Sequence, residues 1–444
     1  MLNKLSLFFG IFLIYFSANA ELFKAQEFFL GNGLHVVVVE NHKAPVIKQM
    51  LWYNVGSAHD GLGKGGRAHF LEHLMFRGTN KVKDGEFNAL MENNGISSNA
   101  FTSYEVTAYH EFADISKLEL LLALEADRMK NLNFDKDAFN TEKQVIIQER
   151  EQVIENNPAA PFNEKFREIV WGNNPFGHPI TGLKEEIVNL SYDDVKTFYN
   201  RYYSPKNAIL VLSGDITIDE AKPLVEKYFG NIKNRPIKAR FVGTPVLKEK
   251  FSQQLEMSLP NIKTPRIVWY YVLPPYAKIK GSVYDYEALE QYLGSGKTSA
   301  LYRDLVLNRK IALSVGANFS FITHTNASFS LSMVPAEGIS ISEAKEALKD
   351  ALQKAVTELN EQKLASVKKK MVADLVYVQD NPSTAANIIG NLLTNGFSLD
   401  FLQSYEADVD KISLKGVKDA YHEIFFNSSN ATGVLLPQIE ENEK

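Results

Sequence analysis

The chain has 444 residues, of which 45% are hydrophobic and 23% are charged, and its formal net charge is −5. This length is enough for two or more domains, and the lack of a dense Lys/Arg block argues against nucleic acid as a partner. The sequence contains no cysteine, which excludes disulfides, a thiol nucleophile and thiolate metal sites, so metal ligands must be His or carboxylate.

The first 20 residues have the pattern of a secretory signal peptide. A single Lys precedes an apolar run over residues 5–16, and residues 18–20 read Ala-Asn-Ala, an A-x-A cleavage site. The run is well short of the ~20 residues that span a bilayer, which argues against the alternative, a membrane anchor. We expect cleavage after Ala20 and an exported chain with no integral membrane segment.

The next elements are predicted from turn residues and strand composition. Residues 27–41 predict a β-hairpin that turns at 31–33, and residues 49–57 predict another strand. A glycine-rich loop, GLGKGG at 61–66, then leads into a helix that begins at about Ala68. The loop lacks the Gly-Lys-Ser/Thr ending of a phosphate-binding loop, so we interpret it as a sharp turn.

Three further elements follow before the middle of the chain. Residues 96–113 are rich in β-branched and aromatic residues and predict a strand. Residues 115–131 and 136–156 repeat apolar residues at helical spacing and predict two helices, the second of which ends before Pro158.

An internal repeat divides the chain into two related halves. Residues 187–208 and 409–431 match at six positions with a constant offset of 222, and both end in Asn-Ala. A chance match between two amphipathic helices is the alternative, but six matches at one offset favour duplication. The predicted regions are a signal peptide (1–20), an N-terminal domain (21–231), a linker (232–250), a C-terminal domain (251–437) and an acidic tail (438–444).

The segment HFLEH, residues 69–73, is the strongest chemical signal. On a helix, His69 and His73 lie on one face and can hold one ion, while Glu72 borders that face. A catalytic zinc site needs three protein ligands and a water whose pKa falls to about 7, and a nearby carboxylate can take its proton. HxxEH is the inverzincin pattern, although a helix with satisfied histidines gives the same letters.

The third ligand must come from elsewhere in the chain. The helix over residues 136–156 offers Glu142, Glu149, Glu151 and Glu155, and Glu142 and Glu149 share a face two turns apart. Spacing alone does not choose among them, because a solvated helix face has the same composition. The corresponding second-half segment is EALEQYLGSGKTS. Its Glu287, Glu290 and Gln291 stand near the positions of His69, Glu72 and His73, so only one half keeps this triplet.

Several motifs in order resemble one family. GGRAHFLEHLMFRGT, GISSNAFTSYEVTAYH, TEKQVIIQEREQV, NPFGHPITG and YLGSGKTSALYRDL are similar to those of the pitrilysin/insulinase metallopeptidases, which include the mitochondrial processing peptidase. The resemblance covers essentially the whole mature chain. The length of the chain is similar to that of the short bacterial two-domain members of the family. It implies an α+β fold of two homologous halves, each an antiparallel sheet covered by helices. It further implies a clam-shell enclosure that favours small or unfolded peptides.

The resemblance also implies roles for individual residues. His69, His73 and Glu149 would bind one zinc ion per chain, and Glu72 would be the general base. Glu142 would support the site from behind. An edge strand carrying Asn99, Ala100 and Phe101 would pair with the backbone of the peptide substrate. The histidines at positions 59, 110, 178 and 422 are interpreted as structural or surface residues.

One departure from the family pattern predicts a partner. Members that are complete in one chain carry an Arg and, seven residues later, a Tyr in the half without zinc. Here Val306 and Leu313 occupy those positions. The resemblance therefore implies that this chain is the zinc-bearing subunit of a heterodimer, whose homologous non-zinc subunit supplies the pair.

The sequence also bears on two alternative functions and on the cellular location. A non-enzymatic family scaffold predicts a broken triplet, whereas all four site residues are present here. A zinc-binding or peptide-binding module is the second alternative, and it predicts binding without turnover. The signal peptide predicts a periplasmic or secreted protein of a Gram-negative bacterium.

Overall fold

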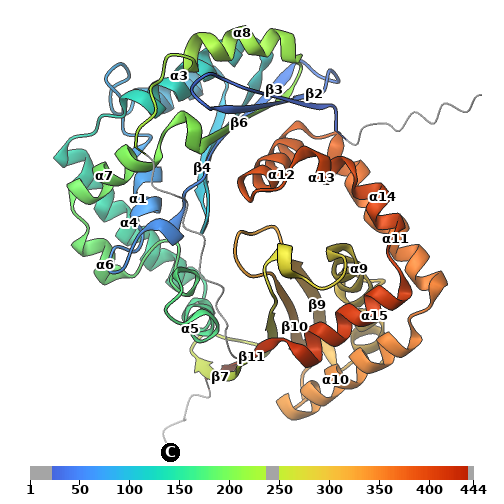
Figure 1. Cartoon of the computed structure of the whole chain (residues 1–444). Coiled ribbons are helices and arrows are strands. Elements are labelled where there is room, and N and C mark those ends of the chain that lie inside the picture. The colour runs from blue at the N-terminus through green and yellow to red at the C-terminus, as the bar shows by residue number, and fades with distance from the viewer. Residues whose placement is uncertain (1–22, 237–249, 439–444) are drawn as a thin grey trace, which may run out of the picture.

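The computed structural model describes residues 23–236 and 250–438, which form two α+β halves with one sheet each (Figure 1). The expected signal peptide lies outside these residues, as do most of the predicted linker and nearly all of the acidic tail. Within the described part of the chain, every helix is too short or too polar to cross a membrane.

The first sheet has six strands in the order β1-β2-β6-β3-β5-β4. Neighbouring strands are antiparallel except for β2 and β6, which run parallel. The expected α+β fold is confirmed, but the sheet is mixed, because β6 returns to it after a long helical connection. The strands are β1 (Ala25–Phe29), β2 (His35–Glu40), β3 (Val46–Tyr53), β4 (Ser97–Thr102), β5 (Thr107–Asp114) and β6 (Ala208–Gly214).

The helices of the first half lie mainly on one face of its sheet, where apolar side chains of α1, α3, α7 and α8 form a common core with it. The predicted helix at 136–156 is confirmed as α4. The elements are η1 (Ser57–His59), α1 (Arg67–Leu74), α2 (Glu86–Asn93), α3 (Leu118–Asn131), α4 (Lys136–Asn156), α5 (Ala160–Trp171), α6 (Lys184–Asn189), α7 (Tyr192–Tyr202) and α8 (Ile218–Phe229).

The single strand predicted at 96–113 is wrong, because this segment is a hairpin. Strands β4 and β5 pair antiparallel and are joined by the turn at residues 103–106. The Ser103 N–H donates to the Val106 carbonyl at 2.8 Å to close this turn. The turn contains no Gly, Pro, Asn or Asp, and Ser103 is its only residue of a type that commonly marks turns.

The second half repeats this arrangement with a five-stranded sheet in the order β7-β11-β8-β10-β9. Only β7 and β11 are parallel. The elements are β7 (Ser252–Leu259), β8 (Arg266–Val272), α9 (Val283–Gly294), η6 (Tyr302–Asn308), β9 (Ala312–Ser320), β10 (Ser328–Pro335), α10 (Ile341–Glu358), α11 (Glu361–Gln379), α12 (Pro382–Thr394), α13 (Leu399–Gln403), α14 (Tyr405–Asp410), α15 (Leu414–His422) and β11 (Ser429–Pro437).

The two sheets correspond strand for strand, as the internal repeat predicts. The order β2-β6-β3-β5-β4 becomes β7-β11-β8-β10-β9, with the parallel pair in the same place. Ser191 and Ser413, matched in the repeat, both cap a helix by accepting a backbone N–H. By this correspondence α1 is equivalent to α9, and α4 is equivalent to α11.

Each half contributes one helix that covers the sheet of the other half, as Figure 1 shows for α5 and α12. We call these two helices the exchanged helices. Helix α12 packs against β3 and β6, and its Gly390 lies against the ring of Trp52. Helix α5 packs against β7 and β11, where Phe162 and Phe166 lie close to Gly433. The halves are therefore joined by two buried apolar clusters.

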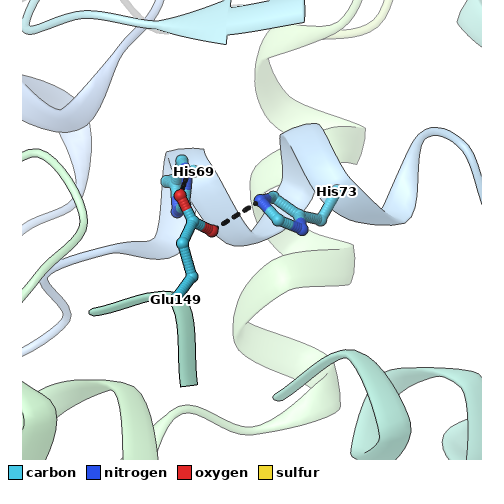
Figure 2. Close-up of side chains that lie close together, drawn as sticks. All are labelled: His69, His73 and Glu149. Carbon is cyan, nitrogen blue, oxygen red and sulfur yellow. Dashed lines mark ion pairs between the residues drawn. The ribbon is translucent and has the colours of Figure 1, made fainter. Parts of the chain in front are cut away.

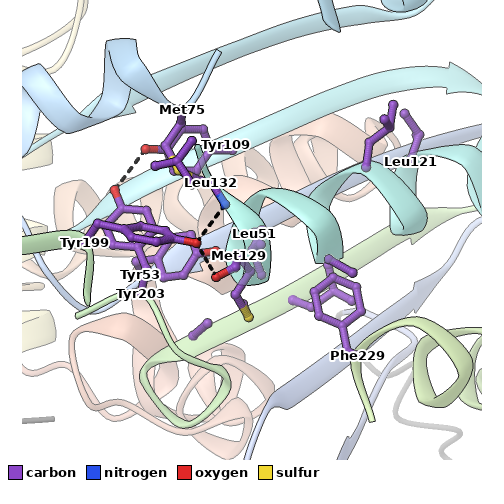
Figure 3. Close-up of a cluster of buried hydrophobic side chains, with 14 of the residues drawn as sticks. Leu51, Tyr53, Met75, Tyr109, Leu121, Met129, Leu132, Tyr199, Tyr203 and Phe229 are labelled. Atoms are coloured by element: carbon purple, nitrogen blue, oxygen red, sulfur yellow. Dashed lines mark hydrogen bonds between the residues drawn. The ribbon is translucent and has the colours of Figure 1, made fainter. Parts of the chain in front are cut away.

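Buried tyrosines fix the helices on the first sheet (Figure 3). The hydroxyls of Tyr109 on β5 and Tyr203, which follows α7, form a hydrogen bond of 2.9 Å. The Tyr199 hydroxyl donates to the Met129 carbonyl at 2.8 Å and accepts from the Leu132 N–H at 3.1 Å. These contacts satisfy polar groups in the core and tie α7 to the end of α3.

Candidate metal centre

Helix α1, which carries the HFLEH segment, is anchored at its first turn by a buried carboxylate. Asp60 accepts hydrogen bonds from the N–H groups of Gly66 at 2.8 Å and Ala68 at 2.7 Å. The Arg67 guanidinium donates to the Asp60 carbonyl. Free N–H groups at a helix start need acceptors, and Asp60 supplies them from outside the helix.

Three metal-binding side chains converge from α1 and α4 (Figure 2). His69 Nε2 lies 3.7 Å from one Glu149 oxygen, and His73 Nε2 lies 3.2 Å from the other. One ligand atom from each of the three residues lies within 4.8 Å of the others, so a single ion can reach all three. The structure therefore brings His69, His73 and Glu149 together.

Glu142 is buried and lies on the Nδ1 side of the His73 ring. The His73 Nδ1–H donates to Glu142 Oε1 at 2.8 Å, and Arg77 Nε lies 3.6 Å from the other Glu142 oxygen. A carboxylate that holds Nδ1 in this way fixes the tautomer and turns Nε2 toward the ion. This is the supporting position expected for Glu142.

The surroundings of the two imidazoles shift their pKa values in opposite directions. Burial, followed by the neighbouring His73, lowers the pKa of His69 to about 4, so its ring is neutral at pH 7. Burial alone would lower the pKa of His73, but hydrogen bonds to Glu142 and Glu149 outweigh it and raise this pKa to about 9. The hydrogen bond from His73 lowers the pKa of Glu149.

These groups fit a divalent cation. Two carboxylates face two imidazoles, and the raised pKa of His73 shows that the pair of carboxylates favours a positive charge at this point. Two imidazole nitrogens and one carboxylate, with room for a further ligand, form a donor set typical of catalytic zinc.

Glu72 borders the same face and is held by the edge strand. Thr102 Oγ1 donates to Glu72 Oε2 at 2.5 Å. Glu72 is 9% exposed, and burial raises its pKa above the ordinary range of a glutamate. A raised pKa moves a carboxylate toward the range in which it both accepts and returns a proton near neutral pH.

The expected substrate strand is β4, which lies at the outer edge of the first sheet. Asn99, Ala100 and Phe101 all belong to it, and Asn99 is exposed. Beside it a cavity of about 320 Å³ opens between α1, α2 and α4. The residues that line this cavity are Glu72, His73, Phe76, Arg77, Asp84, Gly85, Asn88, Asn99 and Glu142.

In the second half, α9 carries no comparable donor set. At the position equivalent to His73, Gln291 Oε1 accepts a hydrogen bond from Lys370 Nζ of α11 at 2.5 Å. Val306 is partly buried against the second core, and Leu313 on β9 is 56% exposed. These two apolar side chains occupy the positions where the family resemblance places the Arg and Tyr.

The four histidines that were interpreted as structural or surface residues do not belong to the metal-binding group found among the described residues. They are His59, His110, His178 and His422. His110 Nδ1, for example, accepts from Lys48 Nζ at 2.7 Å. Sequence reasoning missed Thr102 and Asp60, whose partners are Glu72 and the start of α1. The match at Asn-Ala-Phe-Thr was the only available signal for Thr102, and the sequence gives none for Asp60.

Two family models match the chain and together cover most of it. The model "Insulinase (Peptidase family M16)" matches residues 35–183, which include all the site residues. The model "Peptidase M16 inactive domain" matches residues 189–371, which run from the end of α6 in the first half into α11 of the second half. The HxxEH segment thus lies in the first of these two matches and not in the second.

Curated and solved relatives agree with these matches. The chain is 29% identical to the zinc protease PqqE of Helicobacter pylori over 95% of this chain and 94% of that protein. It is 30% identical to the probable mitochondrial-processing peptidase subunit beta of Schizosaccharomyces pombe, over 52% of each chain. The crystal structure of a protease from Helicobacter pylori superposes with a TM-score of 0.85 at 27% identity, covering 94% of this chain and 100% of that one.

A further solved structure shows the same fold at low identity. The peptidase M16 inactive domain from Pseudomonas fluorescens has a TM-score of 0.79 at 16% identity and covers 94% of this chain and 98% of that one. Both family models, relatives named as zinc proteases and the shared two-sheet fold lead to one conclusion. The chain belongs to the insulinase family of peptidases, family M16.

Proposed function

We propose that this chain is a zinc-dependent endopeptidase that hydrolyses peptide bonds in small or unfolded peptides. The observation that carries the proposal is the convergence of His69, His73 and Glu149, with Glu72 beside them at the edge of a sheet. A zinc ion bound by these three residues would supply Lewis acidity for the attack of water on a peptide carbonyl.

The side chains around the ion have separate tasks. Glu72 takes a proton from the attacking water and returns it to the leaving amine, which its raised pKa favours. Glu142 holds the His73 ring in place through Nδ1. Strand β4 is the outer strand of its sheet, to which an extended peptide adds as a further strand. A folded protein rarely exposes such a segment, so unfolded chains are the preferred substrates.

The proposal is tested with Glu72→Gln and a set of fluorogenic peptides. The wild-type chain should cleave some of them, and Glu72→Gln should lower kcat roughly 100- to 10,000-fold, because the general base is lost. Zinc content should stay at one ion per chain, since all three ligands remain. Glu92→Gln, an exposed change on α2, serves as the control. Unchanged turnover in Glu72→Gln would favour a different function, such as peptide binding alone.

We also propose that this chain is the catalytic subunit of a heterodimer in the periplasm. Support comes from Val306 and Leu313, which cannot provide the charge or hydroxyl of an Arg/Tyr pair, and from the signal-like residues 1–20. Peptide cleavage is compared for the chain alone and with a homologous chain that lacks HxxEH but carries the pair. Full activity of the isolated chain contradicts the heterodimer, and retention of the protein in the cytoplasm contradicts the location.

A further inference from the structure

The turn between β4 and β5, residues 103–106, links the second half to the strand that holds the proposed general base, Glu72. Strand β4 ends at Thr102, which bonds to Glu72, and the turn follows at once. On its other side the turn meets the β9–β10 loop of the second half, residues 321–327, through Glu105. Only two residues, Ser103 and Tyr104, lie between these two contacts.

Glu105 connects the halves through a buried carboxylate. It is 8% exposed, and its Oε2 accepts hydrogen bonds from Thr323 Oγ1 at 3.2 Å and from the His324 N–H at 3.1 Å. The His324 Nε2 in turn lies 2.7 Å from the Thr394 carbonyl at the end of α12. The turn is therefore held by the β9–β10 loop, which is itself tied to the exchanged helix.

The turn is also tied to η1, which precedes helix α1 in the chain. The N–H groups of Ser57 and Ala58 donate to the carbonyls of Ser103 and Tyr104 at 3.0 and 2.8 Å. There is no room for a side chain at Gly56, where a Cβ would lie 2.3 Å from the Ser103 carbonyl oxygen. Such tight packing leaves the turn little freedom to move without displacing Thr102.

We propose that Thr102 and Glu105 are positioning residues through which the second half sets the orientation of the Glu72 carboxylate. The inference rests on the proposed role of Glu72 as general base. A glutamate carboxylate rotates broadly about its last torsion, whereas a general base must be held close to the productive geometry. The Thr102 hydroxyl fixes one oxygen of Glu72, and the Glu105 contact fixes Thr102.

The Thr102 part is tested with two substitutions. Thr102→Val keeps the shape of the side chain but removes the hydroxyl, so kcat should fall roughly 10- to 100-fold, the range for a hydrogen bond to a charged group. KM and zinc content should change less than about twofold, because substrate strand and ligands are intact. Thr102→Ser should restore most of kcat, which a purely structural role would not predict.

The Glu105 part is tested with a double-mutant cycle. Glu105→Ala should lower kcat, and this effect should largely disappear in the Thr102→Val background, because both act through one hydrogen bond. Asp380→Ala, which breaks the ion pair with Lys43 elsewhere between the halves, is the matched control and should leave kcat unchanged. Additive effects of the two substitutions would show that Glu105 does not act through Thr102.

A measurement independent of turnover completes the experiment. In Glu105→Ala, hydrogen exchange of the Ser57 and Ala58 amides should rise relative to wild type and to Asp380→Ala. Unchanged exchange overturns the connection through the turn. If the wild-type chain cleaves no peptide either alone or with the homologous non-zinc chain, the proposed function fails, whereas an active wild type with equal kcat in Thr102→Val overturns only this inference.

Discussion

At the scale of single residues, His73 is the side chain on which the metal centre depends most. It lies between Glu149, the proposed third ligand, and Glu142, which holds the other ring nitrogen. The i, i+4 spacing was enough to predict that His69 and His73 share a helix face, because helical geometry is local. It could not choose Glu149 over Glu142, since both lie on one face of α4 and only tertiary packing distinguishes them.

The role of Glu142 leads to a prediction about metal affinity. Glu142→Ala removes the acceptor for His73 Nδ1, so the ring loses its fixed tautomer and orientation. The dissociation constant for zinc should rise roughly 10- to 100-fold, as measured by competition with a chromophoric chelator. Glu151→Ala, on the same helix and paired with the exposed Lys184, should have no effect. Equal affinity in the two variants would show that Glu142 does not support the site.

His110 leads to a prediction about pH. Burial, followed by the nearby Lys48, lowers the pKa of His110 to about 4, whereas an unfolded His has a pKa near 6.5. The neutral ring therefore contributes stability above pH 6.5, and this contribution is lost as the pH falls from 6.5 toward 4. His110→Gln should show a smaller loss of Tm over this range than wild type. His422→Gln, at an exposed position, should match wild type, and identical slopes in all three proteins would contradict the prediction.

At the scale of elements, local sequence predicted the helices better than the hairpin at the site. Helix α4 follows its apolar spacing and ends before Pro158, as expected. The β4–β5 turn carries Ser103, Tyr104 and Glu105, and it is held by Ser57, Ala58 and the second half. Ser103 is the only typical turn residue in this segment, so the β-branched and aromatic composition of residues 96–113 predicted one strand where there are two.

The start of α1 is also stabilised from outside the helix, which gives a prediction about stability. Asp60→Ala leaves the buried N–H groups of Gly66 and Ala68 without their acceptor. The free energy of unfolding should fall by about 2–4 kcal/mol, measured by urea denaturation. Asp60→Asn, which keeps one acceptor oxygen, should lose less. Asp114→Ala removes the cap of an exposed 3-10 turn and should cost at most about 1 kcal/mol.

At the scale of the whole molecule, the two halves pack together because each sheet is covered by a helix of the other half. The repeat around residues 187–208 and 409–431 predicted two related halves, and the matching sheet orders agree with it. The exchange of α5 and α12 was not predictable, because an apolar helix face looks the same whichever sheet it covers. This exchange is what brings the β9–β10 loop to Glu105.

Gly390 is the point where this exchange can be tested, because a Cβ there would lie 2.1 Å from the Trp52 ring. In a free helix, Gly→Ala adds about 1 kcal/mol of stability. Here the methyl group must push α12 away from β3, so Gly390→Ala should instead destabilise the chain by about 1–3 kcal/mol.

Because α12 belongs to one half and its sheet to the other, hydrogen exchange should rise in both β3 and α12 of Gly390→Ala. Gly31→Ala, at a glycine with nothing within 4 Å, is the control and should leave the urea midpoint unchanged. Stability equal to wild type in Gly390→Ala, or faster exchange confined to α12, would mean that the sheet does not depend on the exchanged helix. Loss of protection from hydrogen exchange in both β3 and α12 would show that the sheet beside the metal centre depends on packing between the halves for its stability.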